Sequence, residues 1–186
     1  MARLLRADKI SVRQCVEALL KGKAIIYPTE TVYGLGVDAM NENAVEGLFE
    51  IKEREKSRPV SVAVADIEHA KKLAVFNKFS DALAEKFLPG PLTLVLKARI
   101  TMPLITTNGR IGIRVPSNRF AQVLLQQFSK PITATSANIS GLKSAVDIRE
   151  IDRRLLDNVE LIVEDPEIRY KKESTVIDLS SSKPRI

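Results

Sequence analysis

Cysteine, histidine and tryptophan are nearly absent from this chain of 186 residues. It contains one cysteine, Cys15, one histidine, His69, and no tryptophan. A single cysteine excludes a disulfide within the chain and a cysteine-based zinc site. A single histidine leaves almost no material for a histidine metal centre or a catalytic triad. Aromatic residues make up only 5% of the chain, so stacking platforms for nucleic-acid bases are scarce.

Long apolar runs are also missing, since no run approaches the roughly 20 residues that a membrane-spanning helix needs. The first six residues, Met1 to Arg6, lack the apolar core of a secretory signal. We therefore expect a cytoplasmic protein without membrane attachment.

The composition is that of a globular protein, with 45% apolar and 28% charged residues. The length predicts one domain over residues 1–186. The net charge of +6 suits anionic partners such as nucleotides or RNA, but it also fits an ordinary solubility charge.

Short helical patterns alternate with short apolar strands along the chain. We expect helices that begin at the capping residues Ser11, Asp66 and Ser80, and another over residues 148–156. Seven strands are expected, at residues 24–27, 60–64, 92–96, 111–115, 132–134, 161–163 and 175–179. Alternation of this kind predicts a three-layer α/β domain, and strands that follow each other without a helix predict a mixed sheet.

The segment 27–36 leaves a predicted strand at a proline and continues with two hydroxyls, a carboxylate and two glycines. This composition at a strand end is typical of ligand-binding loops, although Thr29 and Thr31 could also cap a tight turn. Residues 34–39 fit the dinucleotide fingerprint G-x-G-x-x-A, but they neither follow the strand directly nor open a helix. We therefore reject a Rossmann site, and the sequence contains no P-loop.

Two further segments carry candidate ligand-binding groups. Lys52, Arg54 and Arg58 follow a predicted helix, where cations could neutralise phosphates or form a solvated helix end. Ser136 and Asn138 alternate after a strand, so an extended backbone would point both to one side. Hydroxyls, amides and cations with almost no general base favour phosphate binding and electrostatic transfer chemistry.

Six motifs together resemble the threonylcarbamoyl-AMP synthase family, also called the YrdC-like domain, in its short single-domain form. They lie in the family's order at residues 28–36, 52–54, 89–93, 114–116, 136–141 and 174–178. The resemblance implies a YrdC-like domain with a twisted mixed sheet and a concave, positively charged cavity. After Arg54 the family often continues with proline, whereas Glu55 stands here.

The reaction implied by the resemblance converts L-threonine, bicarbonate or CO2, and ATP to threonylcarbamoyl-AMP and pyrophosphate, with Mg²⁺ on the phosphates. It is the first step toward threonylcarbamoyladenosine in tRNA, so the implied partners include the downstream tRNA threonylcarbamoyl transferase machinery. Weak binding of tRNA or double-stranded RNA is a further expectation. The residues that would hold a metal stay unassigned.

The resemblance also implies roles for individual residues. Catalysis would involve Lys52, Arg54, Thr29 and Thr31. ATP or the adenylate would contact Lys52, Arg58, Arg114, Ser136 and Asn138, and threonine would contact Thr29, Arg54 and Ser174. Tyr33 would cover the site, and Arg185 would reach back to the ligand from a terminal segment without sheet pairing beyond Leu179.

Two other functions stay open on the sequence. A basic cavity would also suit an RNA-binding or ribosome-associated module, against which the scarcity of aromatics counts. The second alternative is a small-molecule lyase on a similar sheet.

Overall fold

The computed structural model describes residues 2–165, 168–181 and 184–185. Its strands are β1 (Arg3–Arg6), β2 (Ile25–Tyr27), β3 (Gly34–Gly36), β4 (Ser61–Ala63), β5 (Ala74–Val75), β6 (Leu92–Ala98), β7 (Arg110–Arg114), β8 (Ile132–Ser136), β9 (Leu161–Glu164) and β10 (Thr175–Asp178). Its helices are α1 (Lys9–Leu20), α2 (Glu42–Ile51), α3 (Ile67–Leu73), α4 (Lys78–Phe87), α5 (Arg119–Phe128), the 3₁₀ helix η1 (Ile148–Glu150) and α6 (Arg153–Leu156).

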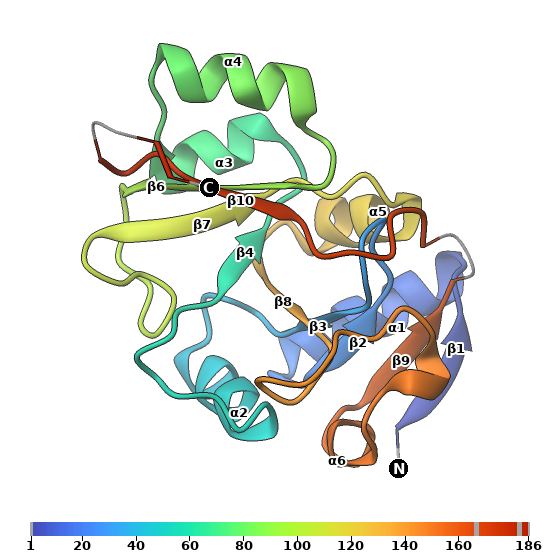
Figure 1. Ribbon diagram of the computed structural model, residues 1–186. Coiled ribbons are helices and arrows are strands. Elements are labelled where there is room, and N and C mark those ends of the chain that lie inside the picture. Colours follow the sequence, from blue (N-terminus) through green and yellow to red (C-terminus); the bar gives the residue numbers. More distant parts are fainter. Residues whose placement is uncertain (1, 166–167, 182–183, 186) are drawn as a thin grey trace.

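The strands within these described ranges form one mixed sheet in the order β1-β9-β2-β3-β8-β4-β7-β6-β10, with β5 paired to β6 (Figure 1). Four pairs are parallel, namely β1/β9, β2/β9, β4/β7 and β6/β10. The other pairs are antiparallel, among them β2/β3 and β6/β7. The predicted mixed sheet is therefore confirmed.

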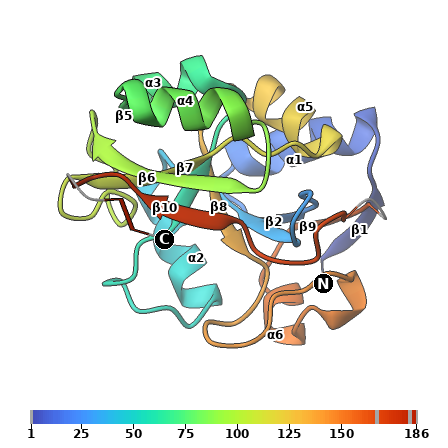
Figure 2. The ribbon, with the colours of Figure 1, turned by 45° about the horizontal axis from the view of Figure 1, so that its top comes forward.

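Helices cover the sheet from two sides. In Figure 2, α1, α3, α4 and α5 lie above the sheet, and α2 and α6 lie below it. The strands alternate accordingly, because successive side chains point to opposite faces. Ile25 and Tyr27 of β2 pack in one buried cluster with α1 and α5, while Ile26 packs in the cluster that includes α2. The three-layer prediction is confirmed.

Two of the predicted helix starts are displaced by three residues. Asp8 caps α1 and Asn77 caps α4, while Ser11 and Ser80 are the third helical residues. Each pair forms a reciprocal capping box, in which the Asp8 carboxylate accepts from Ser11 N at 2.7 Å and the Ser11 hydroxyl accepts from Asp8 N at 2.9 Å. Both members are good capping residues, so the local pattern does not determine which one comes first.

The expected helix over residues 148–156 is broken. Ile151 is extended between η1 and α6, and Asp152 caps α6 by accepting from Arg154 N. The side chain of Asp152 thus satisfies the amide that a continuous helix would have bonded to its own backbone.

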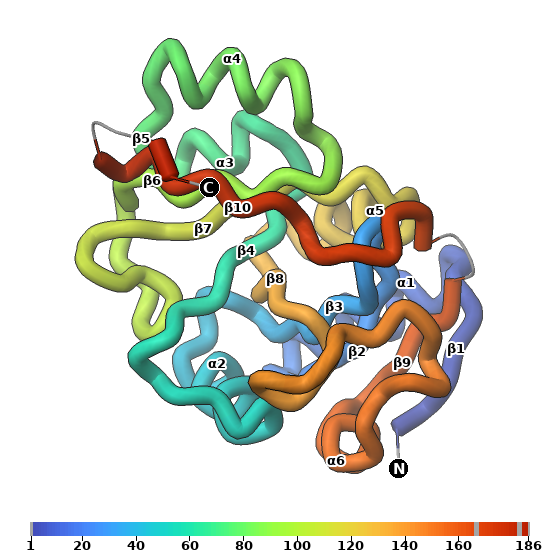
Figure 3. The backbone as a smooth tube through the Cα atoms, in the orientation of Figure 1, coloured from blue at the N-terminus to red at the C-terminus, as the bar shows by residue number. Residues whose placement is uncertain are grey.

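The two glycines of the rejected dinucleotide fingerprint lie in strand β3, which was not among the expected strands and runs beside β2 (Figure 3). A Cβ on Gly36 would lie 2.7 Å from Ile132 Cγ2 and 2.8 Å from the Tyr27 ring. A Cβ on Gly34 would lie 3.0 Å from the same ring. Because these glycines carry no side chain, the Tyr27 ring can pack against the strand. The glycines lie in a strand and not in a loop that opens a helix, so the rejection of a Rossmann site is confirmed.

Candidate functional site

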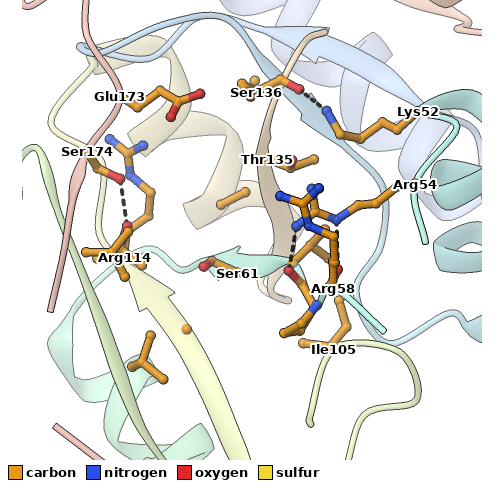
Figure 4. A pocket seen from close by; sticks show the side chains of 18 of the residues that line it. Lys52, Arg54, Arg58, Ser61, Ile105, Arg114, Thr135, Ser136, Glu173 and Ser174 are labelled. Carbon is orange, nitrogen blue, oxygen red and sulfur yellow. Dashed lines mark hydrogen bonds between the residues drawn. The ribbon is translucent and has the colours of Figure 1, made fainter. Parts of the chain in front are cut away.

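A cavity of about 780 Å³ opens on the face of β6 and β7 that α3 and α4 do not cover. Alternate strand residues line it, among them Thr93 and Val95 on β6 and Gly112 and Arg114 on β7. Their neighbours in sequence, such as Leu94, point to the opposite face and are buried in the core. Figure 4 shows side chains from β7, β8, the loop after α2 and the segment before β10 converging on this space.

Lys52 ends α2 and extends into the wall of the cavity. Its side chain is 1% exposed, so the interpretation as a solvated helix end is wrong. Its Nζ donates to the carbonyl oxygens of Ser136 and Asn138, the latter at 2.7 Å, and to Asn138 Oδ1 at 3.2 Å. These three acceptors match the three N–H donors of an ammonium group. Lys52 thereby ties α2 to the loop after β8.

Burial, and after it the positive charge of the nearby Arg54, lower the pKa of Lys52 to about 7. The carboxylate of Glu173 opposes this shift. Because the charge is costly in a buried position, Lys52 is charged below about pH 7 and becomes neutral in alkaline solution.

Ser136 and Asn138 lie on the same side of the chain, as their alternation predicts. The Ser136 hydroxyl donates to Asn138 Oδ1 at 2.6 Å, and both residues line the cavity. The amide nitrogen of Asn138 donates to the carbonyl of Leu142 and so closes the loop that carries both residues.

Arg54 and Arg58 form the opposite lip of the cavity. The half-buried Arg54 donates from Nε to the Arg58 carbonyl at 2.7 Å and from Nη2 to the Pro59 carbonyl at 2.9 Å. These bonds hold the guanidinium against its own loop, and no bond is found from Nη1 to any described residue. Burial and the charge of Arg58 both lower the pKa of Arg54.

Thr29 and Thr31 line the cavity beside Tyr27, and both are buried. The Thr29 hydroxyl donates to the Val32 carbonyl at 2.6 Å and lies 2.8 Å from the Thr31 hydroxyl. Thr29 therefore also caps the local turn. The interpretation as a ligand-binding loop and the interpretation as a capped turn each describe part of this segment. Ser174 faces the same cavity from the segment before β10 and shares a hydrogen bond of 2.8 Å with Thr93.

A buried ion pair supports Arg114. Its Nη2 donates to Glu30 Oε1, and its Nη1 donates to the Thr31 hydroxyl at 3.2 Å. The other oxygen of Glu30 accepts from Ser117 N at 3.0 Å and Asn118 N at 3.3 Å, at the start of α5. Glu30 was given no role from the sequence, although its place between two threonines just after a predicted strand was a signal for one.

The predicted role of Tyr33 is wrong. Its side chain is 2% exposed, packs in the core and donates to the Asp165 carbonyl at 3.1 Å, away from the cavity. Tyr27 lines the cavity instead. Tyr27 pairs with Gly34, so its side chain points to the same face as position 34, whereas Tyr33, one residue earlier, points to the opposite face.

Arg185 does not line the cavity either. Its backbone pairs with Asp178 through two hydrogen bonds of 2.8 and 3.0 Å, so the expectation of no sheet pairing beyond Leu179 is wrong at this residue. Residues 182, 183 and 186 of the same segment lie outside the described residues.

The charged residues that line the cavity are Lys52, Arg54, Arg58, Arg110, Arg114, Glu173 and Asp178. Arg114 is paired with Glu30, Arg110 lies 3.4 Å from Asp178, and the pKa of Lys52 is lowered. A positively charged cavity therefore stays a prediction.

Two features are absent from the described ranges. No three carboxylate, histidine or cysteine side chains there are placed to hold a metal ion. No helix in the same ranges is long and apolar enough to cross a membrane.

Comparisons with known proteins agree on one family. The model of the Sua5/YciO/YrdC family, described as "Telomere recombination", matches residues 17–186. The threonylcarbamoyl-AMP synthase of Pyrococcus abyssi is 37% identical over 96% of this chain, which spans 54% of that protein. The threonylcarbamoyl-AMP synthase of Aliivibrio fischeri is 33% identical over 79% of this chain and 82% of its own length.

A solved structure extends this similarity to three dimensions. The crystal structure of Pyrococcus abyssi Sua5 with L-threonine superposes with a TM-score of 0.92 at 35% identity. It covers 99% of this chain, while this chain covers 56% of that one. The fold, the order of the motifs and the family match coincide, and the chain belongs to the Sua5/YciO/YrdC family.

Proposed function

We propose that this chain is a nucleotidyltransferase that forms threonylcarbamoyl-AMP and pyrophosphate from L-threonine, bicarbonate and ATP. The observation that carries the proposal is the cavity, in which the motif residues Thr31, Lys52, Arg114, Ser136 and Ser174 meet from distant parts of the chain. The match over 99% of the chain to a structure with bound L-threonine supports it.

The residues of the cavity divide into a set for the nucleotide and a residue for the threonine carboxylate. Lys52, Arg58, Ser136 and Asn138 would bind the nucleotide, because cations, a hydroxyl and an amide suit phosphate and ribose oxygens. Arg54 would bind the threonine carboxylate through its unused Nη1. The carbamate oxygen of threonine would then attack the α-phosphorus, and pyrophosphate would leave.

The remaining motif residues would orient these groups. Thr29, Thr31 and Ser174 would surround the reacting centre with Arg114, which would offer a second contact to phosphate or carboxylate. Such a reaction depends mainly on positioning and charge neutralisation, which fits a site built from hydroxyls and cations.

Magnesium would enter with ATP. Because the described residues form no carboxylate or histidine cluster, the donor set fits an ion held by the phosphates of the nucleotide. When bound there, it would neutralise phosphate charge.

Within the cell the product would pass to the tRNA threonylcarbamoyl transferase machinery, in the cytoplasm. Weak binding of tRNA or double-stranded RNA stays part of this proposal, because net positive charge favours such contacts.

Release of pyrophosphate from ATP tests the proposal directly. We expect release that requires both L-threonine and bicarbonate. ATP turnover that does not respond to threonine would overturn the assignment, and tight RNA binding without turnover would favour an RNA-binding module.

ATP binding is expected to take up a proton at about pH 8. The empty protein has a Lys52 pKa of about 7, and bound phosphates raise it because they favour the charged form. Affinity for ATP should therefore fall as the pH rises above about 7. Calorimetry in two buffers of different ionisation enthalpy measures the number of protons taken up per ATP bound. This proton count should approach one. In Lys52→Met the count should drop close to zero, and equal counts in both proteins would contradict the prediction.

A further inference from the structure

The amino-acid substrate sets a charge requirement that the assigned residues meet only in part. This inference rests on the proposed function. Free L-threonine carries both a carboxylate and an ammonium group at neutral pH. The residues assigned to threonine contribute a guanidinium and hydroxyls, so none of them supplies a negative charge for the ammonium group.

Two carboxylates line the cavity among the described residues, Glu173 and Asp178. The carboxylate of Asp178 is occupied on both oxygens. Arg110 Nη1 lies 3.4 Å from Oδ2, and Oδ1 accepts from the backbone and hydroxyl of Ser180, the backbone bond being 2.9 Å long. Both oxygens of Asp178 are therefore engaged by neighbouring residues at the edge of the sheet.

Glu173 has a free carboxylate oxygen. Its Oε1 accepts from the Ser144 hydroxyl, and no bond to Oε2 is found from any described residue. Figure 4 shows the carboxylate turned into the cavity, between Ser136 and Lys52 on one side and Arg114 and Ser174 on the other. Its field also reaches Lys52, whose pKa it raises.

The other charged side chains labelled around the cavity in Figure 4 are cations: Lys52 at the end of α2, Arg54 and Arg58 in the loop that follows, and Arg114 on β7. The guanidinium groups have no lone pair to accept a proton. Lys52 Nζ is directed at three oxygen acceptors. Glu173 is thus the group in this part of the cavity that is placed both to attract an ammonium ion and to accept a proton.

We infer that Glu173 binds the α-ammonium group of the amino-acid substrate and accepts one of its protons. The neutral amine then attacks the carbon of CO2, so that one N–C bond forms and one C–O π bond opens to a carboxylate. The nitrogen releases a second proton to water, which leaves the carbamate that the proposed reaction consumes. Bicarbonate supplies CO2 by taking up one proton and losing water.

Binding measurements test the ammonium site without any turnover. The probes are L-threonine and 2,3-dihydroxybutanoate, in which a hydroxyl replaces the ammonium group. We expect the native chain to prefer threonine by at least ~10-fold, and Glu173→Gln to lose this preference. Affinity for ATP, measured at about pH 6 so that Lys52 stays charged, should stay within about two-fold. Glu85→Gln, on the exposed side of α4, is the control and should behave like the native chain.

The pH dependence of turnover tests the proton acceptor. Near neutral pH, Glu173→Gln should release pyrophosphate about 100-fold more slowly than the native chain, a common contribution of a general base. The deficit should shrink below about 10-fold by about pH 9.5, because solution then supplies threonine with a neutral amine. Glu173→Asp should recover part of the rate.

A deficit that is equal at every pH, or an unchanged preference for threonine in Glu173→Gln, would overturn the inference. A different result would contradict the proposed function. A native chain that prefers threonine as described, yet releases no threonine-dependent pyrophosphate, would overturn the function and support the ammonium site.

Discussion

Replacement of Lys52 by methionine is expected to reduce threonine-dependent pyrophosphate release by at least about 100-fold. The substitution removes a charge-assisted contact worth roughly 3 kcal/mol in a preorganised site. It also removes the donor from the carbonyl oxygens of Ser136 and Asn138 and one of the two donors from Asn138 Oδ1. Because these two residues share a loop, the substitution should weaken ATP binding as well as turnover.

Lys56→Met is the matched control for this prediction. Lys56 lies four residues further along the same loop, is exposed and pairs with Glu46 at 2.7 Å outside the cavity. Its replacement should leave the rate within about two-fold, since exposed ion pairs contribute little. Near-native rates in Lys52→Met would remove Lys52 from the site.

Replacement of Glu30 by glutamine is expected to lower the free energy of unfolding by about 3–5 kcal/mol, because it leaves the buried guanidinium of Arg114 without its counter-charge. The amides of Ser117 and Asn118 at the start of α5 also lose an anionic acceptor. For a chain of this size the melting temperature should fall by roughly 10 °C. Denaturant titration and calorimetry measure both quantities.

Two controls separate charge from packing in this prediction. Glu46→Gln breaks an exposed ion pair and should cost less than about 1 kcal/mol. The double variant Glu30→Gln with Arg114→Met removes both buried charges and should be more stable than Glu30→Gln alone. A double variant that is no more stable would show that the ion pair is not the source of the loss.

Local patterns predicted the secondary structure well where the apolar period was clear. The helix that Asp66 caps and the strand at residues 92–96 appear where the local pattern places them. Strand β3 was missed because Gly34 and Gly36 carry no side chain and so give no alternation signal. Strands β1 and β5 were missed because they are short and partly exposed at the sheet margins.

The candidate site was predicted mostly through its motifs. Every residue assigned to ATP or threonine lines one cavity, including Arg58 and Ser174, which are far apart in sequence. Tyr33 was misplaced because a motif identifies a residue without giving the direction of its side chain. Glu30 and Glu173 lie within motifs or beside them, but their partners Arg114 and Ser144 are distant in sequence.

The sequence by itself determined the composition of the site, the fold class and the family, because apolar periodicity and residue order are local properties of the chain. Tertiary structure alone decided which polar groups are buried and which of them pair. Lys52 illustrates the difference, since its partners Ser136 and Asn138 lie 84 and 86 residues away. Such pairs depend on the strand order that brings β8 beside β3 and β4. That order follows from packing both faces of the whole sheet at once, which no single segment encodes.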